Sequence, residues 1–319
     1  MSNRAAAGLT SIEGSPLLAE TERIGAPPFT RHRGFALLRD YYELAKPRVV
    51  FMVLVTAAAG YYLGSSQSFD PRRLLDLLVG TTLCAAGTLA LNQFMERDLD
   101  ALMNRTRLRP LPSGRLSPRE ALLFGVGATV LGLLHLWATT NALTAGLTAA
   151  ITIVYLALYT PLKRWTSACS IVGAIPGALP PVAGWAAARG AFGLEPAILF
   201  AIMYLWQLPH SLAIAHLYRH DYARAGIRLL PTVDPTGRST MRQIVINSFA
   251  LLAVGMMPSV LAMAGAPYFV VSTLLGLLMV GAGLKLSFQP ESAQAARRVM
   301  FASLLYLPGV LLMLVIDRV

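Results

Sequence analysis

Long apolar segments constrain this chain of 319 residues more strongly than any other feature of its sequence. A helix needs about 20 apolar residues to cross the hydrocarbon core of a membrane. Because backbone groups cannot stay unpaired in lipid, such segments are expected to be helical. Nine segments approach this length, at residues 47–64, 74–95, 120–138, 142–160, 168–188, 194–215, 242–264, 268–286 and 299–316. The sequence therefore predicts an all-α polytopic membrane protein with nine transmembrane helices.

Two further observations refine this fold. Only 13% of the residues are charged, which is about half the share typical of soluble domains. The fifth apolar segment contains Pro176, Pro180 and Pro181, and proline removes a helical hydrogen bond and clashes with the preceding turn. We expect this segment to be kinked or broken.

The N-terminal residues differ from the rest of the chain. Residues 1–34 are rich in Gly, Pro, Ser and Thr and lack the apolar core of a signal peptide. They are predicted to form a disordered cytoplasmic tail. Residues 35–46 mix aromatic, aliphatic and charged side chains, which predicts a helix lying in the membrane interface. A single membrane domain is thus expected over 35–319.

The basic residues predict the orientation of the chain. With the N-terminus inside, all of the 27 Lys and Arg residues fall in inside segments except Arg72, Arg73, Arg189 and Arg318. Basic residues concentrate on the cytoplasmic side of membrane proteins. The sequence predicts a cytoplasmic N-terminus and a periplasmic C-terminus. The net charge of +11 is explained by this bias and by anionic lipid, so nucleic acid is not an expected partner.

Three polar residues follow one another at the end of the second apolar segment. Asn92, Glu96 and Asp100 are spaced by four, so in a helix each lies about 40° from the next on one face, whereas Asp98 points nearly the opposite way. Amide and carboxylate oxygens suit Mg²⁺, which is often bridged by substrate phosphates. A helix end that simply emerges into water is the competing interpretation.

Basic residues immediately downstream favour the metal interpretation. Arg105, Arg107, Arg109 and Arg115 lie in a loop containing Pro and Gly, and guanidinium groups match phosphate oxygens in pairs. Lys163 and Arg164 end the fourth segment on the same side, although ordinary topology charges would also explain them. The combination predicts metal–diphosphate chemistry.

The sixth segment ends in a second polar group. His210 follows Pro209 inside the segment, and His216, Arg219, Asp221 and Tyr222 come shortly after. Ionisable groups at this depth usually face a cavity or a partner. For His210, a packing role and a catalytic role are equally compatible with the sequence.

These motifs resemble those of a known family. The spacing of Asn92, Glu96 and Asp100, followed by 103–110, resembles the first signature of the UbiA-type intramembrane prenyltransferases, and more narrowly of the protohaem IX farnesyltransferases. Residues 159–164, 173–185, 206–210 and 221–226 agree with the same family. The resemblance runs from about Tyr42 to the C-terminus.

The resemblance implies a function and a set of site residues. It implies nine transmembrane helices around a central cavity, farnesyl diphosphate as donor, haem B as acceptor, and haem O and diphosphate as products. Mg²⁺ would be held by Asn92, Glu96 and Asp100. The residues implied to bind diphosphate are Arg105, Arg109, Lys163 and Arg164, and those expected near haem are His210, His216, Arg219 and Tyr222.

This sequence departs from the family pattern at the second acidic cluster, and the resemblance also implies a location and partners. The family usually carries two acidic clusters, whereas this chain has a lone Asp221 at the second position, which puts a second protein-held Mg²⁺ in doubt and makes an orienting role an alternative for Asp221. The expected location is a bacterial-type inner membrane. The expected partners are membrane lipid and either a haem A synthase or a second copy of the chain.

Three other functions were compatible with parts of the sequence. A sister prenyltransferase acting on an aromatic acid or quinone precursor would share the Mg²⁺ face but should carry a fuller second acidic cluster. A secondary transporter would place its ionisable residues near the membrane midplane, and here they gather at helix ends. A haem-binding subunit without catalysis would not need carboxylates beside arginines.

Overall fold

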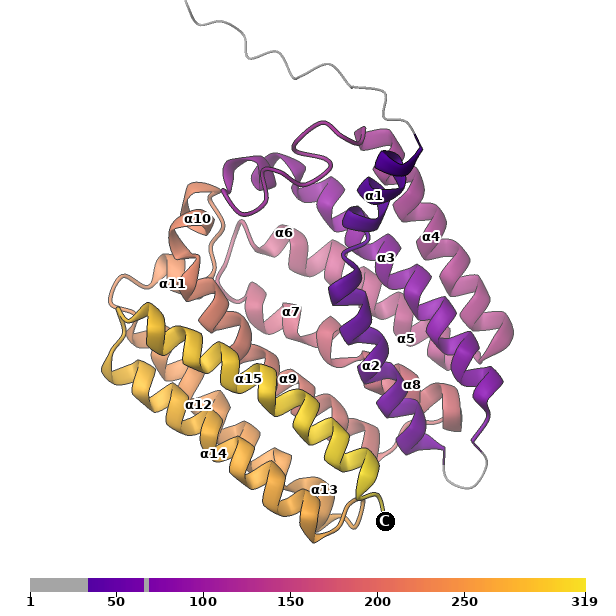
Figure 1. The fold of residues 1–319 in the computed structure, drawn as a ribbon, viewed down its shortest axis with the longest axis vertical. Helices are drawn as coiled ribbons and strands as arrows, with labels where there is room; N and C mark the ends of the chain where they lie inside the picture. Colours follow the sequence, from indigo (N-terminus) through magenta and orange to yellow (C-terminus); the bar gives the residue numbers. More distant parts are fainter. Residues whose placement is uncertain (1–33, 66–68) are drawn as a thin grey trace, which may run out of the picture.

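The computed structural model describes residues 34–65 and 69–319, and this part of the chain is a bundle of helices without strands (Figure 1). A single isolated bridge joins Ala264 and Arg318. In chain order the elements are α1 (Phe35–Leu44), α2 (Pro47–Gly64), α3 (Pro71–Leu102), α4 (Pro118–Thr139), α5 (Ala142–Ile153), the π-helix η2 (Val154–Tyr159), α6 (Thr160–Leu162), α7 (Cys169–Ala178), α8 (Pro180–Arg189), α9 (Leu194–Leu217), α10 (Arg219–Arg224), α11 (Leu230–Val233), α12 (Arg238–Gly255), α13 (Met257–Val260), α14 (Ala266–Phe288) and α15 (Ala293–Ile316).

The predicted membrane fold is confirmed. Within the described ranges, nine helical stretches are long and apolar enough to span a membrane. The fifth stretch is broken as expected, because α7 ends at Ala178 and α8 begins at Pro180. Helix α1 occupies most of the predicted interfacial segment, and its Phe35, Leu38 and Tyr42 are exposed. The predicted tail lies outside the described residues, apart from Gly34.

Some helices extend beyond the predicted spans. Helix α3 runs from Pro71 to Leu102, well past the expected end at residue 95. Neighbouring elements cover its polar face, so the helix continues beyond the apolar segment. At its start, Asp70 caps the helix by accepting hydrogen bonds from the backbone N–H groups of Arg72 and Arg73. The length of α3 carries the polar residues of its last turns beyond the apolar span.

Small residues bring the helices of the bundle together. Gly60 on α2 and Gly184 on α8 sit where the two backbones touch. A Cβ added at Gly60 would lie 1.9 Å from the carbonyl oxygen of Pro181, and one at Gly184 would lie 1.9 Å from that of Ala57. Association inside a membrane depends on such close packing, because lipid supplies no hydrophobic drive between helices.

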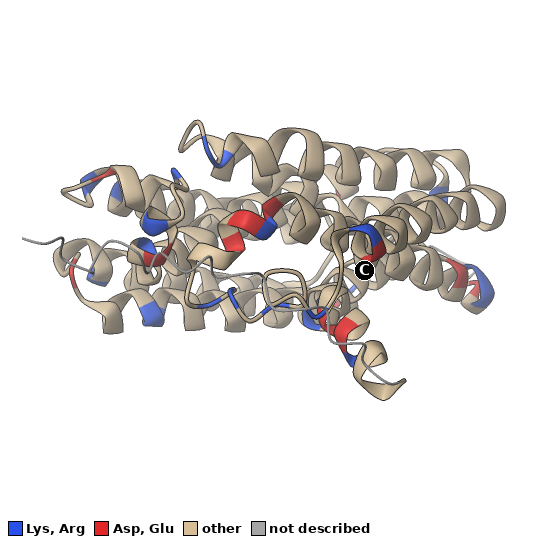
Figure 2. Cartoon of the chain, turned by 90° about the horizontal axis from the view of Figure 1, so that it is seen from above, with Lys and Arg blue, Asp and Glu red and all other residues tan. Residues whose placement is uncertain are grey.

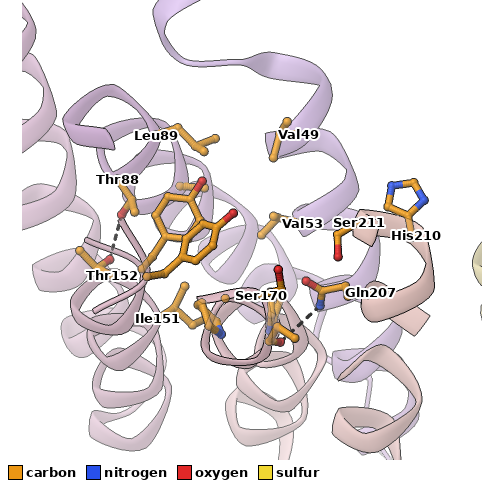
Figure 3. Close-up of a pocket in the computed structure, with 18 of the residues that line it drawn as sticks. Val49, Val53, Thr88, Leu89, Ile151, Thr152, Ser170, Gln207, His210 and Ser211 are labelled. Atoms are coloured by element: carbon orange, nitrogen blue, oxygen red, sulfur yellow. Dashed lines mark hydrogen bonds between the residues drawn. The ribbon is translucent and has the colours of Figure 1, made fainter. Parts of the chain in front are cut away.

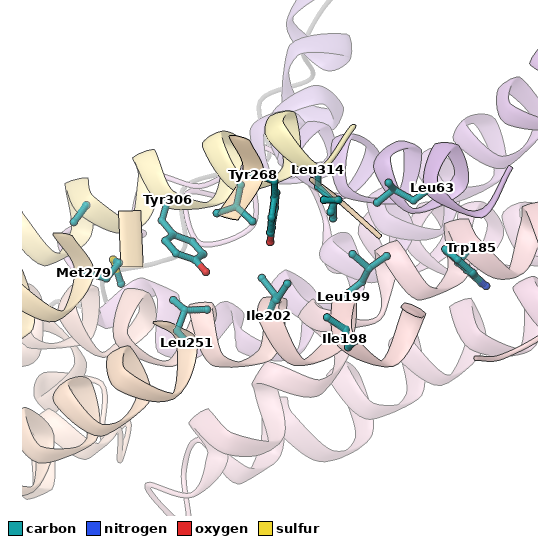
Figure 4. Close-up of a cluster of buried hydrophobic side chains, with 13 residues drawn as sticks. Leu63, Trp185, Ile198, Leu199, Ile202, Leu251, Tyr268, Met279, Tyr306 and Leu314 are labelled. Atoms are coloured by element: carbon teal, nitrogen blue, oxygen red, sulfur yellow. The ribbon is translucent and has the colours of Figure 1, made fainter. Parts of the chain in front are cut away.

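A buried aromatic cluster joins the second half of the bundle (Figure 4). Tyr268 on α14 and Tyr306 on α15 are fully buried among side chains that also come from α2, α8, α9 and α12. The Tyr268 hydroxyl donates to the carbonyl oxygen of Gly255, at 2.8 Å. This cluster fixes α9, which carries the second polar motif, against α12, α14 and α15.

The charged residues gather at one end of the bundle. We call this the site end; it carries α1, α6, α10 and residues 103–117, and it lies at the top of Figure 1. The opposite end carries α13 and the C-terminus. Seen from above, one group of acidic residues lies on a helix near the middle of the bundle, while other charged residues lie further out (Figure 2). The site end is therefore where ligand chemistry is to be sought.

Replacing Gly60 or Gly184 by Ala is expected to destabilise the protein by about 1–3 kcal/mol, because the new methyl group would force α2 and α8 apart. Thermal unfolding of the purified protein in detergent measures the loss. Gly146→Ala is the matched control, since nothing lies within 4 Å of a Cβ at that position. A control as unstable as the other two variants would refute the close contact between α2 and α8.

Candidate active site

The polar face of α3 is buried at the site end of the bundle. Asn92 is 1% exposed, Glu96 7% and Asp100 1%, whereas the side chain of Asp98 is 79% exposed. This is the arrangement that the four-residue spacing predicted. Carboxylates are not buried without partners because the desolvation cost is large, so the identity of those partners defines the site.

Two cations from different parts of the chain neutralise these carboxylates. Lys163, the residue after α6, lies 2.7 Å from Glu96 Oε1 through its Nζ atom. Arg109, in the loop after α3, lies 2.7 Å from Asp100 Oδ2 through Nη1. The structure therefore brings together four of the predicted site residues. Burial opposes the charge of Lys163, but Tyr159 and Glu96 raise the pKa of its amine above the usual value, so it stays an ammonium.

The loop after α3 is held in place by its own hydrogen bonds. The Thr106 hydroxyl donates to the Asp100 carbonyl oxygen, at 2.8 Å. Arg115 pairs with Asp40 and, at 2.7 Å, with Glu43 on α1, and its guanidinium also donates to the Leu108 carbonyl oxygen. The loop is thus fastened between α1 and α3, which fixes the direction from which Arg109 reaches Asp100.

Lys46 belongs to the cluster and was missed as a site residue from the sequence. Its Nζ donates to Asn92 Oδ1, at 3.4 Å. The residue has φ 51°, a left-handed conformation that costs a non-glycine residue about 1–2 kcal/mol. Burial, reinforced by the nearby Arg109, lowers the pKa of Lys46 to about 7. The sequence feature that could have indicated its role is its position directly before Pro47, at the junction of α1 and α2.

A hydrogen-bond chain orients the Asn92 amide. The Thr160 hydroxyl donates to the Tyr155 carbonyl oxygen, at 2.8 Å, so its oxygen must accept from Asn92 Nδ2, at 3.1 Å. The amide nitrogen is occupied by this contact, and Asn92 Oδ1 is left facing Lys46. A cation-binding position can therefore use the Asn92 oxygen without any change of rotamer.

A π-helical turn places two tyrosines beneath the charged cluster. In η2, residues Tyr155 and Tyr159 lie with ring centroids 5.2 Å apart. The Lys163 ammonium lies 4.3 Å from the Tyr159 ring centroid, a geometry that favours a cation. This turn was not predicted from the sequence; π-helical turns are rare and are frequent at functional sites.

A cavity of about 360 Å³ is lined by Tyr155 and Tyr159, whereas the charged side chains of Glu96, Asp100, Lys163 and Arg109 lie outside its lining; Figure 3 shows part of the wall. Its wall is mainly apolar and comes from α2, α3, α5, η2, α7, α8, α9 and α10. Thr88 on α3, one turn before Asn92, shares a 2.9 Å hydrogen bond with Thr152 in its wall, and Gln207 on α9 also lines it. An apolar cavity of this size with a few polar side chains in its wall is typical of a small-molecule site.

The second polar motif touches the loop after α3. The Arg105 backbone N–H donates to Asp221 Oδ2, at 3.3 Å, and its guanidinium donates to the Tyr222 hydroxyl, at 2.9 Å. Asp221 also pairs with Arg224. Arg105 further packs over the Tyr218 and Tyr222 rings. The carboxylate of Asp221 thus contacts the Arg224 guanidinium and the Arg105 backbone N–H, a geometry compatible with the orienting role that the sequence left open.

The remaining predicted residues lie at different distances from the cavity. His210 lines it, stacks on Trp206 and shares a 2.7 Å hydrogen bond with Ser303 on α15. Tyr222 also lines it. His216 is buried outside the lining, and Arg219 pairs with Glu291 at 2.6 Å. Arg164 is exposed and forms no ion pair with any described residue, because adjacent residues in a helical turn point about 100° apart.

The oxygen ligands fit Mg²⁺ but do not enclose it. No group of three His, Cys, Asp or Glu side chains that could hold a metal occurs among residues 34–65 and 69–319. The candidate ligands are the amide oxygen of Asn92 and the carboxylates of Glu96 and Asp100, all on one face of α3. Mg²⁺ prefers such oxygens and usually keeps water or substrate phosphate as its other ligands. The donors suit an ion that arrives with an anionic substrate.

Comparison with known families supports the same chemistry. The model of the UbiA prenyltransferase family matches residues 53–305. The chain belongs to this family. The protoheme IX farnesyltransferase of Solibacter usitatus is 47% identical over 290 residues, covering 88% of this chain and 99% of that protein. The protoheme IX farnesyltransferase of Koribacter versatilis is 41% identical over 292 residues, covering 89% and 94%.

A solved structure shares the UbiA fold. It is a UbiA homologue from Archaeoglobus fulgidus bound to DMAPP and Mg²⁺, with a TM-score of 0.61, 16% identity, and coverage of 86% of this chain and 99% of that chain. At this identity the likeness concerns the fold. It confirms the helical bundle expected from the apolar segments.

Proposed function

We propose that this chain transfers the farnesyl group of farnesyl diphosphate to a vinyl group of haem B, giving haem O and diphosphate. The observation that carries the proposal is the buried face of Asn92, Glu96 and Asp100, which is paired with Lys163 and Arg109. Lys163 also contacts the ring of Tyr159, which lines an apolar cavity. The relatives named protoheme IX farnesyltransferase support the choice of substrates.

The cationic side chains would bind the diphosphate. Lys163 and Arg109 each form a hydrogen bond with a carboxylate. Lys46 contacts Asn92 on the same face of α3, and Arg105 belongs to the same loop as Arg109. When the allylic C–O bond breaks, its electron pair leaves with the diphosphate, and preorganised donors stabilise the charge that grows there. Arg164 is exposed, so its position does not support direct contact with the diphosphate.

Asn92, Glu96 and Asp100 would hold Mg²⁺, which when bound would supply further neutralisation of the diphosphate charge. The Archaeoglobus fulgidus neighbour, bound to DMAPP and Mg²⁺, supports this assignment. Asp221 is proposed as a positioning residue for Arg105 and not as a metal ligand, because Arg224 and the Arg105 backbone engage both of its oxygens.

The cavity would carry the reaction of the allylic fragment. Its apolar wall limits access of bulk water while the vinyl group of the porphyrin forms the new carbon–carbon bond. One water then adds to the cation left on the former vinyl carbon and loses a proton, which completes the hydroxyethylfarnesyl substituent. Tyr155 and Tyr159 line the part nearest the charged cluster, where ring faces favour positive charge. His210 and Tyr222 are the expected haem contacts that line the cavity, whereas His216 and Arg219 would need a second contact region.

Glu96→Gln and Asp100→Asn are each expected to lower turnover by roughly a hundredfold or more, because each removes charge from the proposed Mg²⁺–diphosphate site. Formation of haem O, measured by liquid chromatography and mass spectrometry, gives the rate. Asp98→Asn is the matched control and should stay close to the parent protein, since that side chain is exposed. Equal losses in all three variants would contradict the role of the buried face.

Membranes containing this chain, supplied with haem B, farnesyl diphosphate and Mg²⁺, are expected to yield a haem that has gained the mass of a farnesyl group and a hydroxyl group. Chelation by EDTA should abolish the product, and added Mg²⁺ should restore it. Farnesylation of an aromatic acid or quinone precursor in place of haem would instead assign the chain to a sister prenyltransferase. Product formation that persists in EDTA would refute the proposed metal.

We further propose a bacterial-type inner membrane as the location, with the site end on the cytoplasmic side. The distribution of Lys and Arg supports this orientation. An apolar product would remain in the membrane, which favours direct transfer to a membrane-bound haem A synthase. A second copy of the chain is the other proposed partner. Co-purification from solubilised membranes tests both.

Alkaline phosphatase fused after Val319 is expected to be active in cells, because this orientation places the C-terminus in the periplasm. Fluorescent protein fused at the same position should be poorly fluorescent. A bright C-terminal fusion combined with inactive phosphatase would reverse the proposed orientation and leave the chemistry of the site unaffected.

A further inference from the structure

A second hollow lies on the outside of the bundle, away from the cavity. It is a groove of about 340 Å³ between the start of α12 and the end of α14, on the left of Figure 1. Its lining comprises Thr236, Gly237, Arg238, Met241, Arg242, Val245, Leu284, Ser287 and Pro290. None of these residues takes part in the proposed reaction.

Two arginines form the charged part of the groove. Arg238 and Arg242 are exposed and one helical turn apart on α12, so their side chains share a face. Neither has a carboxylate within ion-pairing distance among the described residues, whereas Arg109, Arg115, Arg219 and Arg224 all do. The groove therefore holds two cations that the protein itself leaves uncompensated.

The acidic residue just before α12 in the chain is already engaged. Asp234 accepts hydrogen bonds from the Thr240 backbone N–H and hydroxyl, at 2.8 and 2.9 Å, and from the Thr236 hydroxyl, at 3.3 Å. It forms no ion pair with Arg238 or Arg242. An anion in the groove could therefore be bound by both guanidinium groups.

The groove changes from charged to apolar with depth. Helix α12 descends from the site end, so Val245 lies about 10 Å below Arg238, and α14 ascends from Leu284 to Ser287 beside it. Further along the same helices Phe249 and Leu277 are exposed and apolar. A phosphate at the rim with hydrocarbon chains below would match this gradient.

We propose that the groove between α12 and α14 is a binding site for one anionic glycerophospholipid, with its phosphate between Arg238 and Arg242 and an acyl chain along Val245 and Leu284. Guanidinium groups bind phosphate oxygens in pairs, and basic pockets between transmembrane helices suit anionic headgroups. The site would fasten α12 and α14 to the lipid leaflet at the site end and is independent of the proposed reaction.

Native mass spectrometry of the purified full-length protein, titrated with phosphatidylglycerol and with phosphatidylcholine of the same acyl chains, tests the proposal. One phosphatidylglycerol should bind in preference to phosphatidylcholine. The double variant Arg238→Gln/Arg242→Gln should weaken that binding roughly tenfold or more. Arg297→Gln/Arg298→Gln, with the same change of charge on exposed residues outside the groove, should change it less than about twofold.

Two outcomes would overturn the site. Equal weakening in both double variants would mean diffuse attraction to the basic surface, and equal binding of phosphatidylcholine would remove the role of charge. Val245→Trp, which fills the apolar part of the groove, separates a lipid from free phosphate: it should weaken phosphatidylglycerol binding and leave inorganic phosphate unaffected. Phosphatidylglycerol binding unchanged by Val245→Trp would refute the acyl-chain contact. Parent-like elution and melting temperature serve as the folding check.

Discussion

The structure depends on keeping two carboxylates buried at the end of a membrane-spanning helix. Glu96 and Asp100 would each lose several kcal/mol of hydration without a compensating charge, and Lys163 and Arg109 supply it at 2.7 Å. These cations come from the ends of other elements, so α3, α6 and residues 103–117 must meet at one place. Two contacts hold these helices in place. They are the packing of α2 against α8 and the buried aromatic cluster around Tyr268 and Tyr306.

Much of the fold and part of the site could be predicted from the sequence because both rest on periodic patterns. Apolar length predicts spans, and the break between α7 and α8 follows from prolines that cannot continue a helix. The spacing of Asn92, Glu96 and Asp100 predicts a shared face and sets Asp98 apart, as observed. Within an uninterrupted α-helix, the relative direction of two side chains follows from their spacing.

The parts that sequence could not supply depend on contacts between distant segments. In the sequence, Lys46 is one of many basic residues near helix ends. Its hydrogen bond to Asn92 is formed only in the folded chain. Lys163 and Arg164 are adjacent and equally basic, yet one is largely shielded beside Glu96 and the other is exposed. The hydrogen bond between the Arg105 backbone and Asp221 likewise requires α10 to lie against the loop after α3.

The π-helical turn η2 has a consequence for the geometry of the cluster. A π-turn accommodates an additional residue compared with an α-turn, and one residue corresponds to a rotation of about 100°. Everything after Tyr159 is therefore turned relative to an uninterrupted helix, including Thr160, which fixes the Asn92 amide, and Lys163, which meets Glu96. The additional residue in η2 thus rotates the helix end so that Lys163 faces Glu96 on α3, while the other helices of the wall keep their α-helical pitch.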